Sequence, residues 1–256
     1  MRFPLTAEFL QTPLAHRAYH DRAMGRVENS PSAVQAALDA GYGIELDVQL
    51  SSDGQAMVFH DDELDRLTAE IGSVRRRSSA ELQSIPLTDS SDTIPTLSQI
   101  LAQIAGRVPL LIEIKDQSLT LSQTDGRLES AVATALADYS GPVAVMSFNP
   151  HCIAHMRDLA PNIPRGLTTA AYDPTEWAML PLATCARLRA IEDYDPTAST
   201  FISHEAADLD NPRVAELKSI GARILCWTIR SPQEEATARR IADNVTFEGY
   251  AAPIPD

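Results

Sequence analysis

The residues of this chain that could carry chemistry are three acids, two histidines and two cations, most of them at the ends of short apolar runs. They are Glu45, Asp47, Glu113, His16, His60, Arg17 and Lys115. An apolar run that finishes in charged residues is typical of a buried strand that ends at a solvent-exposed rim. If these strands are parallel neighbours, their ends meet at one mouth and the side chains converge there. The pattern then predicts a metal-assisted acid/base site.

The three acids indicate a cation site. Glu45 and Asp47 lie two apart on one predicted strand, so their side chains point to the same side, and Glu113 adds a third carboxylate. Carboxylates forced together must take up protons or share a cation, and an all-oxygen set suits Mg²⁺ or Ca²⁺. The alternative is that Glu45 and Asp47 face solvent on an edge strand. In a barrel, however, they would face the interior, where unpaired acids are not tolerated, and this favours the metal.

The histidines indicate proton transfer. A lone histidine on an apolar run is more often structural, but His16 and His60 are predicted at the same rim as the three acids. Because imidazole titrates near neutrality, one can take a proton while the other gives one. His151 and His155 lie four apart on a predicted helix and are a possible metal pair, but no carboxylate completes the motif. A solvated helix face is the preferred interpretation for them.

Arg17 and Lys115 are the cations of the predicted site. Arg17 follows His16 directly, and Lys115 shares the strand face of Glu113. Cations aimed at developing negative charge are what phosphoryl transfer requires, although salt bridges with the same acids are the simpler alternative. The sequence has no glycine-rich phosphate loop and no GxSxG motif, which argues against a nucleoside triphosphate and against a serine hydrolase.

The elements that must position these residues alternate between strands and helices, which predicts a parallel sheet with helical crossovers. Strands are predicted at 13–16, 43–48, 56–60, 109–114, 142–147, 164–168, 188–192, 200–203 and 223–229. Helices are predicted at 31–40, 96–105, 127–139, 150–159, 174–187, 210–219 and 232–242. We expect an α/β fold of the TIM type, a somewhat irregular (β/α)8 barrel that spans residues 1–256 as one domain. Nine strands are predicted where eight close such a barrel, so one is an extension or an error.

One connection departs from the alternation. Only 12 residues separate Asp47 from His60, too few for a helical crossover, and they include Asp53-Gly54, a strong hairpin signal. A two-residue turn at that dipeptide would set Asp47 opposite His60. The polar segment 63–92 that follows is predicted to form a small inserted lobe over the rim.

Composition limits the function classes. A length of 256 residues fits a single barrel of about 250 residues. The net charge of -14 argues against nucleic-acid binding and against docking on anionic lipid. No apolar stretch reaches signal-peptide or membrane-spanning length. The three cysteines are widely spaced and odd in number, which favours reduced thiols over a disulfide framework or a zinc site. We therefore expect a cytoplasmic protein without stable membrane insertion, and its oligomeric state stays open.

Taken in order, these motifs resemble those of the glycerophosphodiester phosphodiesterase family. The matching positions are His16-Arg17, Glu28-Asn29, Glu45-Leu46-Asp47, Asp53-Gly54, His60-Asp61, Pro95-Thr96-Leu97, Glu113-Ile114-Lys115 and, more weakly, Trp227-Thr228. The resemblance covers roughly residues 12 to 148. It departs from the family pattern at Ala18, where glycine is usual, in a longer loop from Arg17 to Glu28, and in a tail (244–253) that lacks the usual Thr-Asp before proline.

The resemblance implies a TIM-type barrel that hydrolyses glycerophosphodiesters to glycerol phosphate and an alcohol. It implies one divalent cation, Mg²⁺ or Ca²⁺, on the three acids Glu45, Asp47 and Glu113. It implies His16 and His60 as the acid/base pair, and Arg17, Lys115 and Trp227 as residues that contact a small phosphodiester substrate. Two alternatives stay open: a lyase that releases a cyclic phosphate, and a barrel that binds phospholigands without catalysis.

Overall fold

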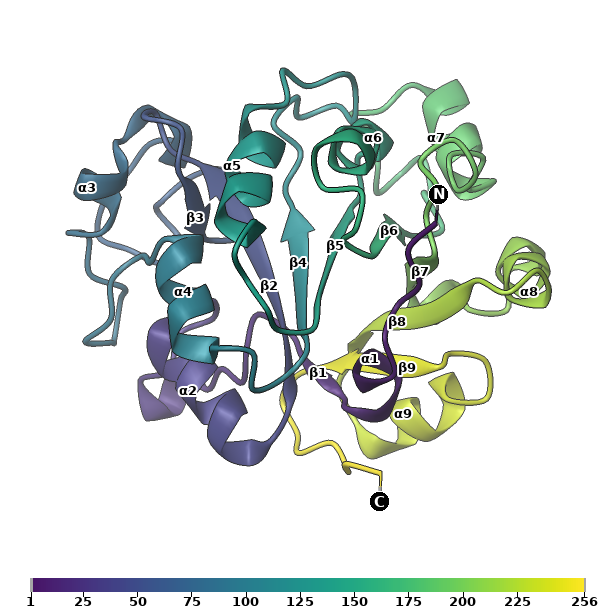
Figure 1. The fold of residues 1–256 in the computed structure, drawn as a ribbon, viewed down its shortest axis with the longest axis horizontal. Helices are drawn as coiled ribbons and strands as arrows, with labels where there is room; N and C mark the ends of the chain where they lie inside the picture. The colour runs from purple at the N-terminus through teal and green to yellow at the C-terminus, as the bar shows by residue number, and fades with distance from the viewer. Residues whose placement is uncertain (1, 256) are drawn as a thin grey trace.

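The computed structural model describes residues 2–255, which form a closed barrel of eight parallel strands wrapped by helices (Figure 1). The barrel strands are β1 (Leu14–Ala15), β2 (Gly43–Leu50), β4 (Leu110–Ile114), β5 (Val143–Ser147), β6 (Arg165–Thr169), β7 (Phe201–Glu205), β8 (Arg223–Ile229) and β9 (Asn244–Phe247). Strand β1 pairs with both β2 and β9 and so closes the cylinder. The predicted TIM-type fold is confirmed.

The ninth strand, β3 (Ala56–Val58), runs antiparallel to β2 and lies outside the barrel. Its register places Asp47 opposite Phe59 rather than opposite His60, so the predicted register was wrong by one residue. The cause is the turn, which spans the three residues 52–54 instead of the expected two. Three-residue hairpin loops are the next most common class after two-residue ones.

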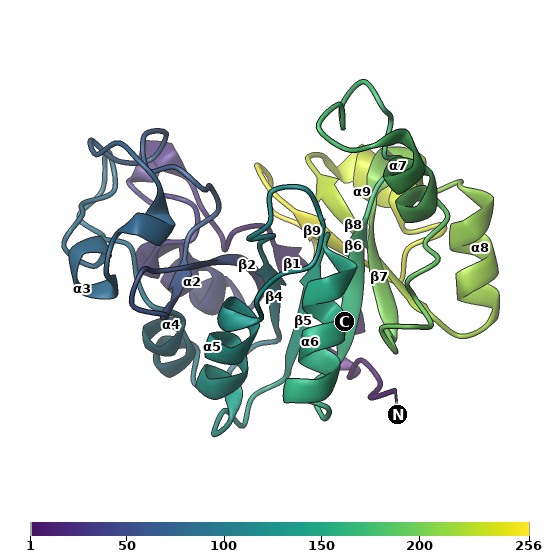
Figure 2. The ribbon, with the colours of Figure 1, turned by 90° about the horizontal axis from the view of Figure 1, so that it is seen from above.

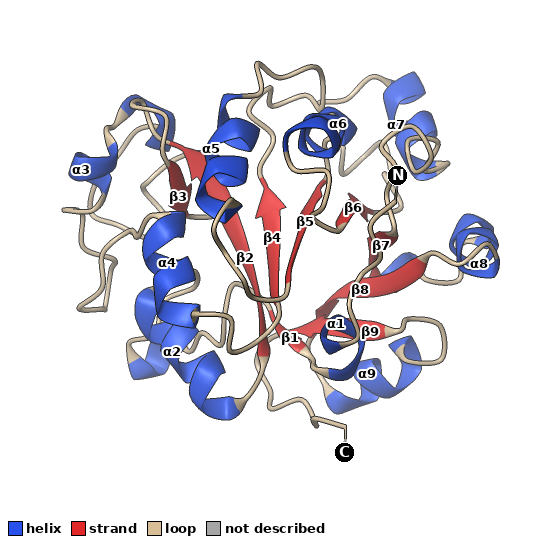
Figure 3. Ribbon diagram, in the orientation of Figure 1, coloured by secondary structure: helices blue, strands red, loops and turns tan. Residues whose placement is uncertain are grey.

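The helices surround the barrel, as the colouring in Figure 3 shows. They are α1 (Glu8–Gln11), α2 (Pro31–Ala40), α3 (Ser79–Leu82), α4 (Leu97–Ile104), α5 (Arg127–Leu136), α6 (Pro150–Leu159), α7 (Leu182–Arg189), α8 (Pro212–Ser219) and α9 (Pro232–Ala238). Short 3-10 turns are η1 (Arg22–Met24), η2 (Val74–Arg76) and η3 (Ala206–Asp208). Four helices begin with a Ser or Asn cap followed by proline at the first helical position. Among residues 2–255, no helix is both long and apolar enough to cross a membrane.

One predicted strand does not exist and one real strand was missed. The segment 188–192 is the end of α7 and the turn after it, and the helix predicted from 174 begins only at Leu182. Leu188 and Ile191 are buried, but their spacing of three is that of a helical turn, not of a strand. The missing eighth barrel strand is β9.

Side-chain alternation along the strands separates two apolar layers. Ile44, Leu46 and Val48 of β2 point outward and pack under the helices. The barrel interior holds a second cluster, which Phe9 of α1 joins near the amino ends of the strands. That interior cluster consists of Leu5, Phe9, Leu14, Leu111, Ala144, Met146, Phe201 and Leu225. Since it fills the amino-terminal part of the interior, the carboxyl-terminal part is left for polar residues.

The segment 63–92 carries its own small apolar cluster, which includes Leu64, Leu67 and Leu82 and packs against Met57 of β3. Figure 2 shows this part of the chain, with α3, on the opposite side of the molecule from α8. The lobe therefore lies next to the strand that carries two of the three acids.

Candidate active site

The three acids meet inside the barrel near the carboxyl ends of β2 and β4. Asp47 and Glu113 are register partners on these neighbouring strands, and Glu45 lies two residues before Asp47. One carboxylate oxygen from each lies within 4.8 Å of the others, and all three residues are at most 7% exposed. Burial, and then the charges of Asp47 and Glu113, raise the pKa of Glu45 well above its usual value. The acids are therefore crowded enough to bind either protons or a cation.

Lys115 partly neutralises this group from the end of β4. Its Nζ donates a hydrogen bond to Glu113 Oε1 at 2.8 Å and lies 3.4 Å from Asp47 Oδ1. Burial alone would raise the pKa of Asp47, but the nearby cations, Lys115 first, outweigh it and hold this pKa below its usual range. Asp47 therefore stays ionised more readily than Glu45.

The loop after β1 folds back over the acids. Arg17 and Ala18 both have left-handed backbone, with φ of 52° and 65°, and this directs the Arg17 amide to Glu45 Oε2 at 2.9 Å. Glycine adopts this conformation more easily than alanine, which explains why a glycine at position 18 is usual. The Arg17 guanidinium donates to Glu28 Oε1 at 2.7 Å, and its Nε lies 3.7 Å from Asp47 Oδ2.

Two further residues of the same loop were not assigned a role from the sequence. Asn29 donates from Nδ2 to Asp47 Oδ2 at 2.9 Å and accepts from the Asp47 amide at 3.2 Å, which fixes that carboxylate. Glu28 joins Arg17 to Arg66 of the inserted lobe, whose Nη2 lies 2.7 Å from Glu28 Oε1. The Glu28-Asn29 motif was the available signal, because both residues match the family pattern.

His60 is oriented by its neighbour in sequence. Its Nδ1 lies 2.6 Å from Asp61 Oδ1, and Asp61 is held by Arg66. Burial alone would raise the pKa of Asp61, but the hydrogen bond from His60, followed by those from Arg66, holds it below its usual range. The other ring nitrogen, Nε2, lies 3.2 Å from Lys115 Nζ. Because an ammonium group can only donate, His60 accepts at Nε2 and carries its proton on Nδ1.

His16 is oriented by a residue from the far end of the chain. Its Nδ1 lies 2.6 Å from Oε2 of Glu248, the residue that follows β9. Burial lowers the pKa of His16, and the hydrogen bond to Glu248 offsets this only in part. His20 Nε2 lies 3.7 Å from the same carboxylate oxygen, and Arg230 Nε donates to the other oxygen at 2.8 Å.

Trp227 lies on β8, in a group of aromatic residues near the ends of β5, β6 and β8. Its ring centroid is 5.4 Å from that of Phe148, which in turn is 5.5 Å from Trp177, and Tyr172 completes the group. Trp227 Nε1 donates to the Ser203 carbonyl at 3.0 Å. The group is an apolar wall on strands other than those that carry the acids.

His151 and His155 lie on α6 and are not part of this site, which agrees with the preferred interpretation that they belong to a helix face rather than to a metal pair. His155 Nε2 lies 3.4 Å from the Thr124 carbonyl oxygen. Within residues 2–255, neither histidine belongs to a group of three side chains that could hold a metal.

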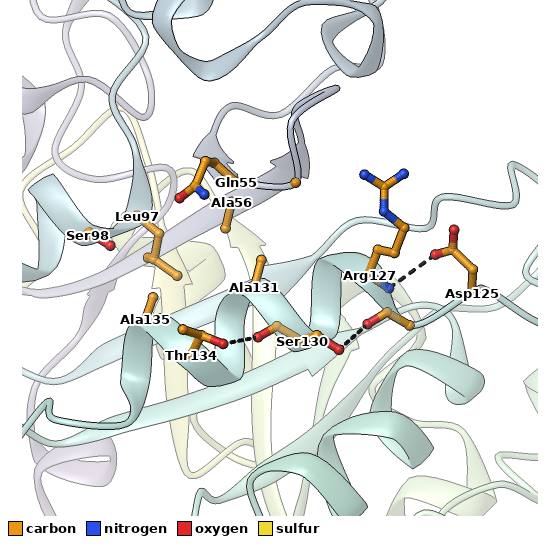
Figure 4. Close-up of a pocket in the computed structure, with 12 residues that line it drawn as sticks. Gln55, Ala56, Leu97, Ser98, Asp125, Arg127, Ser130, Ala131, Thr134 and Ala135 are labelled. Atoms are coloured by element: carbon orange, nitrogen blue, oxygen red, sulfur yellow. Dashed lines mark hydrogen bonds between the residues drawn. The ribbon is translucent and has the colours of Figure 1, made fainter.

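A hollow of about 560 Å³ lies elsewhere, between α4, α5 and the β2–β3 turn (Figure 4). Its lining includes Leu97, Asp125, Arg127 and Ser130 but no histidine and none of the three clustered acids. It offers neither a proton carrier nor a cation site, so the mouth of the barrel is the candidate active site.

A TIM-type barrel with crowded acids, two carboxylate-bound imidazoles and two cations at the carboxyl ends of its strands has the parts of a metal-assisted hydrolase of phosphate esters. Residues 16–245 match the Glycerophosphoryl diester phosphodiesterase family. The chain belongs to this family of phosphodiester hydrolases.

Individual relatives agree with this assignment. The chain is 26% identical to YhdW of Bacillus subtilis (strain 168) over 252 residues, which are 95% of this chain and 94% of the relative. It is 30% identical over 148 residues to the glycerophosphodiester phosphodiesterase of Caldanaerobacter subterraneus, covering 55% of this chain and 60% of the relative.

Solved structures share the fold. An Oleispira antarctica phosphodiesterase, solved in complex with the product sn-glycerol-3-phosphate, superposes with a TM-score of 0.76 at 23% identity over 94% of both chains. A Parabacteroides distasonis glycerophosphodiester phosphodiesterase superposes with a TM-score of 0.72 at 20% identity over 92% of both chains.

Proposed function

We propose that this chain hydrolyses glycerophosphodiesters to glycerol phosphate and an alcohol, and that a divalent cation assists by binding Glu45, Asp47 and Glu113. The observation that carries the proposal is the convergence of these three buried carboxylates with two imidazoles, each of which is hydrogen-bonded to its own carboxylate. Family membership supports the reaction class, and the sn-glycerol-3-phosphate product of the Oleispira enzyme supports a product of similar size.

The acids fit a hard cation. Three carboxylates within 4.8 Å, one of them with a strongly raised pKa, repel one another in a buried site, and a shared dication removes that repulsion. Oxygen donors alone suit Mg²⁺ or Ca²⁺ rather than zinc or copper. When bound, such a cation stabilises charge on a phosphate oxygen and lowers the pKa of an adjacent water or hydroxyl.

The cations and aromatic residues of the chain would place the substrate. Arg17 and Lys115 lie beside the acids and can donate hydrogen bonds to phosphate oxygens, which a metal ion itself cannot do. Trp227 and its aromatic neighbours form the apolar wall for the organic part of the substrate. A small phosphodiester is therefore the partner that the site suits best, and a cytoplasmic location stays a prediction.

The two imidazoles would move the protons. His16 is the base: burial keeps it neutral, and its hydrogen bond to Glu248 leaves Nε2 free to accept a proton. The nucleophilic oxygen forms the new bond to phosphorus and gives its proton to His16. The bond to the alcohol oxygen breaks, and His60 gives its proton to that oxygen; for this step the ring must first take up a second proton at Nε2, and Asp61 then stabilises the imidazolium through Nδ1.

The test is turnover of glycerophosphocholine with Mg²⁺ or Ca²⁺, followed by phosphorus NMR. Release of glycerol phosphate that stops on chelation and in His16→Ala supports the proposal. Undiminished activity after either change rejects the mechanism. Accumulation of a cyclic diester would identify the lyase instead, and binding without turnover under any metal would identify a phospholigand-binding barrel.

A further inference from the structure

The His16 ring is held by a carboxylate that comes from the opposite end of the chain. Glu248 Oε2 lies 2.6 Å from His16 Nδ1, and both side chains are at least four-fifths buried. Arg230 donates to the other carboxylate oxygen at 2.8 Å, and His20 lies 3.7 Å from the oxygen that His16 contacts. The carboxylate is thus hydrogen-bonded at both oxygens, by His16 and by Arg230, which leaves it little freedom to turn away from His16.

The hydrogen-bond chemistry of this pair fixes the His16 tautomer. The imidazoles of His16 and then His20 lower the pKa of Glu248 far below its usual range, so the carboxylate is ionised at neutral pH and can only accept. His16 must therefore donate from Nδ1, and its lone pair lies on Nε2. Within residues 2–255, no side chain or backbone group is hydrogen-bonded to that nitrogen.

We propose that Glu248 is a positioning residue of the reaction: it holds His16 as the Nδ1–H tautomer, so that Nε2 is the atom that accepts the proton. It also stabilises the imidazolium that forms when His16 takes that proton. This inference rests on the proposed function and adds to it a residue that does not touch the reacting atoms.

His16 and His60 are both held at Nδ1 by a carboxylate, but the two carboxylates come from different places in the sequence. Asp61 is adjacent to its histidine in sequence, whereas Glu248 is separated from His16 by 232 positions. The buried His204 is held differently: its Nδ1 lies 2.8 Å from the hydroxyl Thr169 Oγ1, and its carboxylate neighbour, Asp208, lies 3.2 Å from the other ring nitrogen, Nε2. His20, which belongs to the longer loop after Arg17, contributes only through the shared carboxylate.

The variant that tests this inference is Glu248→Gln, which keeps size and shape but removes the charge. The amide can donate to Nδ1 and favour the wrong tautomer, so we expect kcat to fall by about 100-fold or more while KM changes by less than about 3-fold. Glu234→Gln is the matched control: Glu234 accepts from the Arg230 amide at 2.7 Å and does not contact His16. It should retain wild-type kcat.

The pH profile separates a positioning role from a structural one. The charged groups that face His16 are Arg17 on its own loop, Asp47 on β2 and Glu248 after β9, with His20 beside the carboxylate. Loss of the Glu248 charge removes an interaction that favours the imidazolium, so the acid limb of kcat/KM should move to lower pH in Glu248→Gln. An unchanged acid limb together with an unchanged kcat would overturn the inference.

A double variant and a spectroscopic measurement complete the test. In a His16→Ala background, Glu248→Gln should cost less than about 2-fold, because there is no ring left to orient. Full additivity would show that Glu248 acts on something else. Nitrogen-15 NMR of the wild-type histidines should show the His16 proton on Nδ1, and an Nε2–H signal would refute the inference. This last measurement needs no turnover and no variant, so it tests the tautomer separately from the proposed hydrolysis and even if Glu248→Gln does not fold.

Discussion

Replacement of Glu45 by glutamine should stabilise the metal-free protein while it abolishes function. Glu45 lies within 4.8 Å of Asp47 and Glu113. At that distance, with an effective dielectric constant of about 20, each pair of like charges repels by roughly 3.5 kcal/mol. The Arg17 amide and the nearby cations stabilise the ionised Glu45 and so offset part of this repulsion. We therefore expect Glu45→Gln to raise the unfolding free energy by about 2 kcal/mol at neutral pH.

The pH dependence gives this prediction its sign. The folded-state pKa of Glu45 is raised above the unfolded value near 4.5. The stability linked to this group is therefore complete below about pH 4.5 and is lost as the pH rises toward the folded-state pKa, by at most about 1.4 kcal/mol per pH unit. The difference in unfolding free energy between Glu45→Gln and the wild type should therefore be absent at about pH 4 and should grow as the pH rises toward neutrality.

The assay is urea unfolding between about pH 4 and pH 8, with chelator and with saturating Mg²⁺ or Ca²⁺. The cation should stabilise the wild-type protein, because it binds only the folded state, and should stabilise Glu45→Gln much less. The exposed Glu176 offers a matched control, since Glu176→Gln should follow the wild-type curve in both conditions. A Glu45→Gln variant that is less stable than wild type with chelator at neutral pH, or that gains as much from the cation, would refute the reasoning.

Three further outcomes are expected. His60→Ala should lower kcat on glycerophosphocholine by about 10²–10⁴-fold, and Asp61→Asn should lower it by less. On a diester with a nitrophenol leaving group, which needs no acid, both variants should lower kcat only slightly. Equal losses on both substrates would exclude His60 as the acid. Lys115→Met should cost about 3–5 kcal/mol in urea unfolding with chelator, because it leaves buried carboxylates without their cation, and a cost below about 1 kcal/mol would show that the acids are already protonated. Trp227→Ala should raise KM with kcat nearly unchanged in steady-state kinetics, and a fall in kcat alone would remove Trp227 from substrate binding.

The part of the site that follows from the sequence is the part encoded within short runs. In β2 the apolar residues alternate with the acids, so one strand periodicity fixes both which face packs under helices and which face carries Glu45 and Asp47. The pairing of Asp47 with Glu113 then needs only that β2 and β4 be parallel neighbours. Both conditions can be derived from patterns of fewer than ten residues, and so the acid group was predictable.

The two errors in the strand predictions have different causes. The segment 188–192 has the pattern of an apolar strand, but Leu188 lies in the last turn of α7 and Ile191 lies in the turn that follows the helix. The two side chains are buried at helical spacing. Strand β9 is only four residues long and is fully buried, but it includes the polar residues Asn244 and Thr246, so its sequence lacks the apolar pattern of a buried strand. Asn244 is buried because its Nδ2 donates to two carbonyl oxygens near α1, of Phe9 and Thr12, a role that no local pattern reveals.

The missed strand and the missed partner of His16 share one physical cause. The barrel closes where Ala15 of β1 pairs with Phe247 of β9, and the next bond of that ladder runs from the His16 amide to the Phe247 carbonyl at 2.8 Å. This register sets the residues after each strand, His16 and Glu248, side by side. A slip of one residue would turn the ring and the carboxylate to opposite faces of the sheet. Orientation of the proposed base is therefore a property of barrel closure, whereas orientation of His60 is a property of two adjacent residues, and only the second can be inferred before the fold is complete.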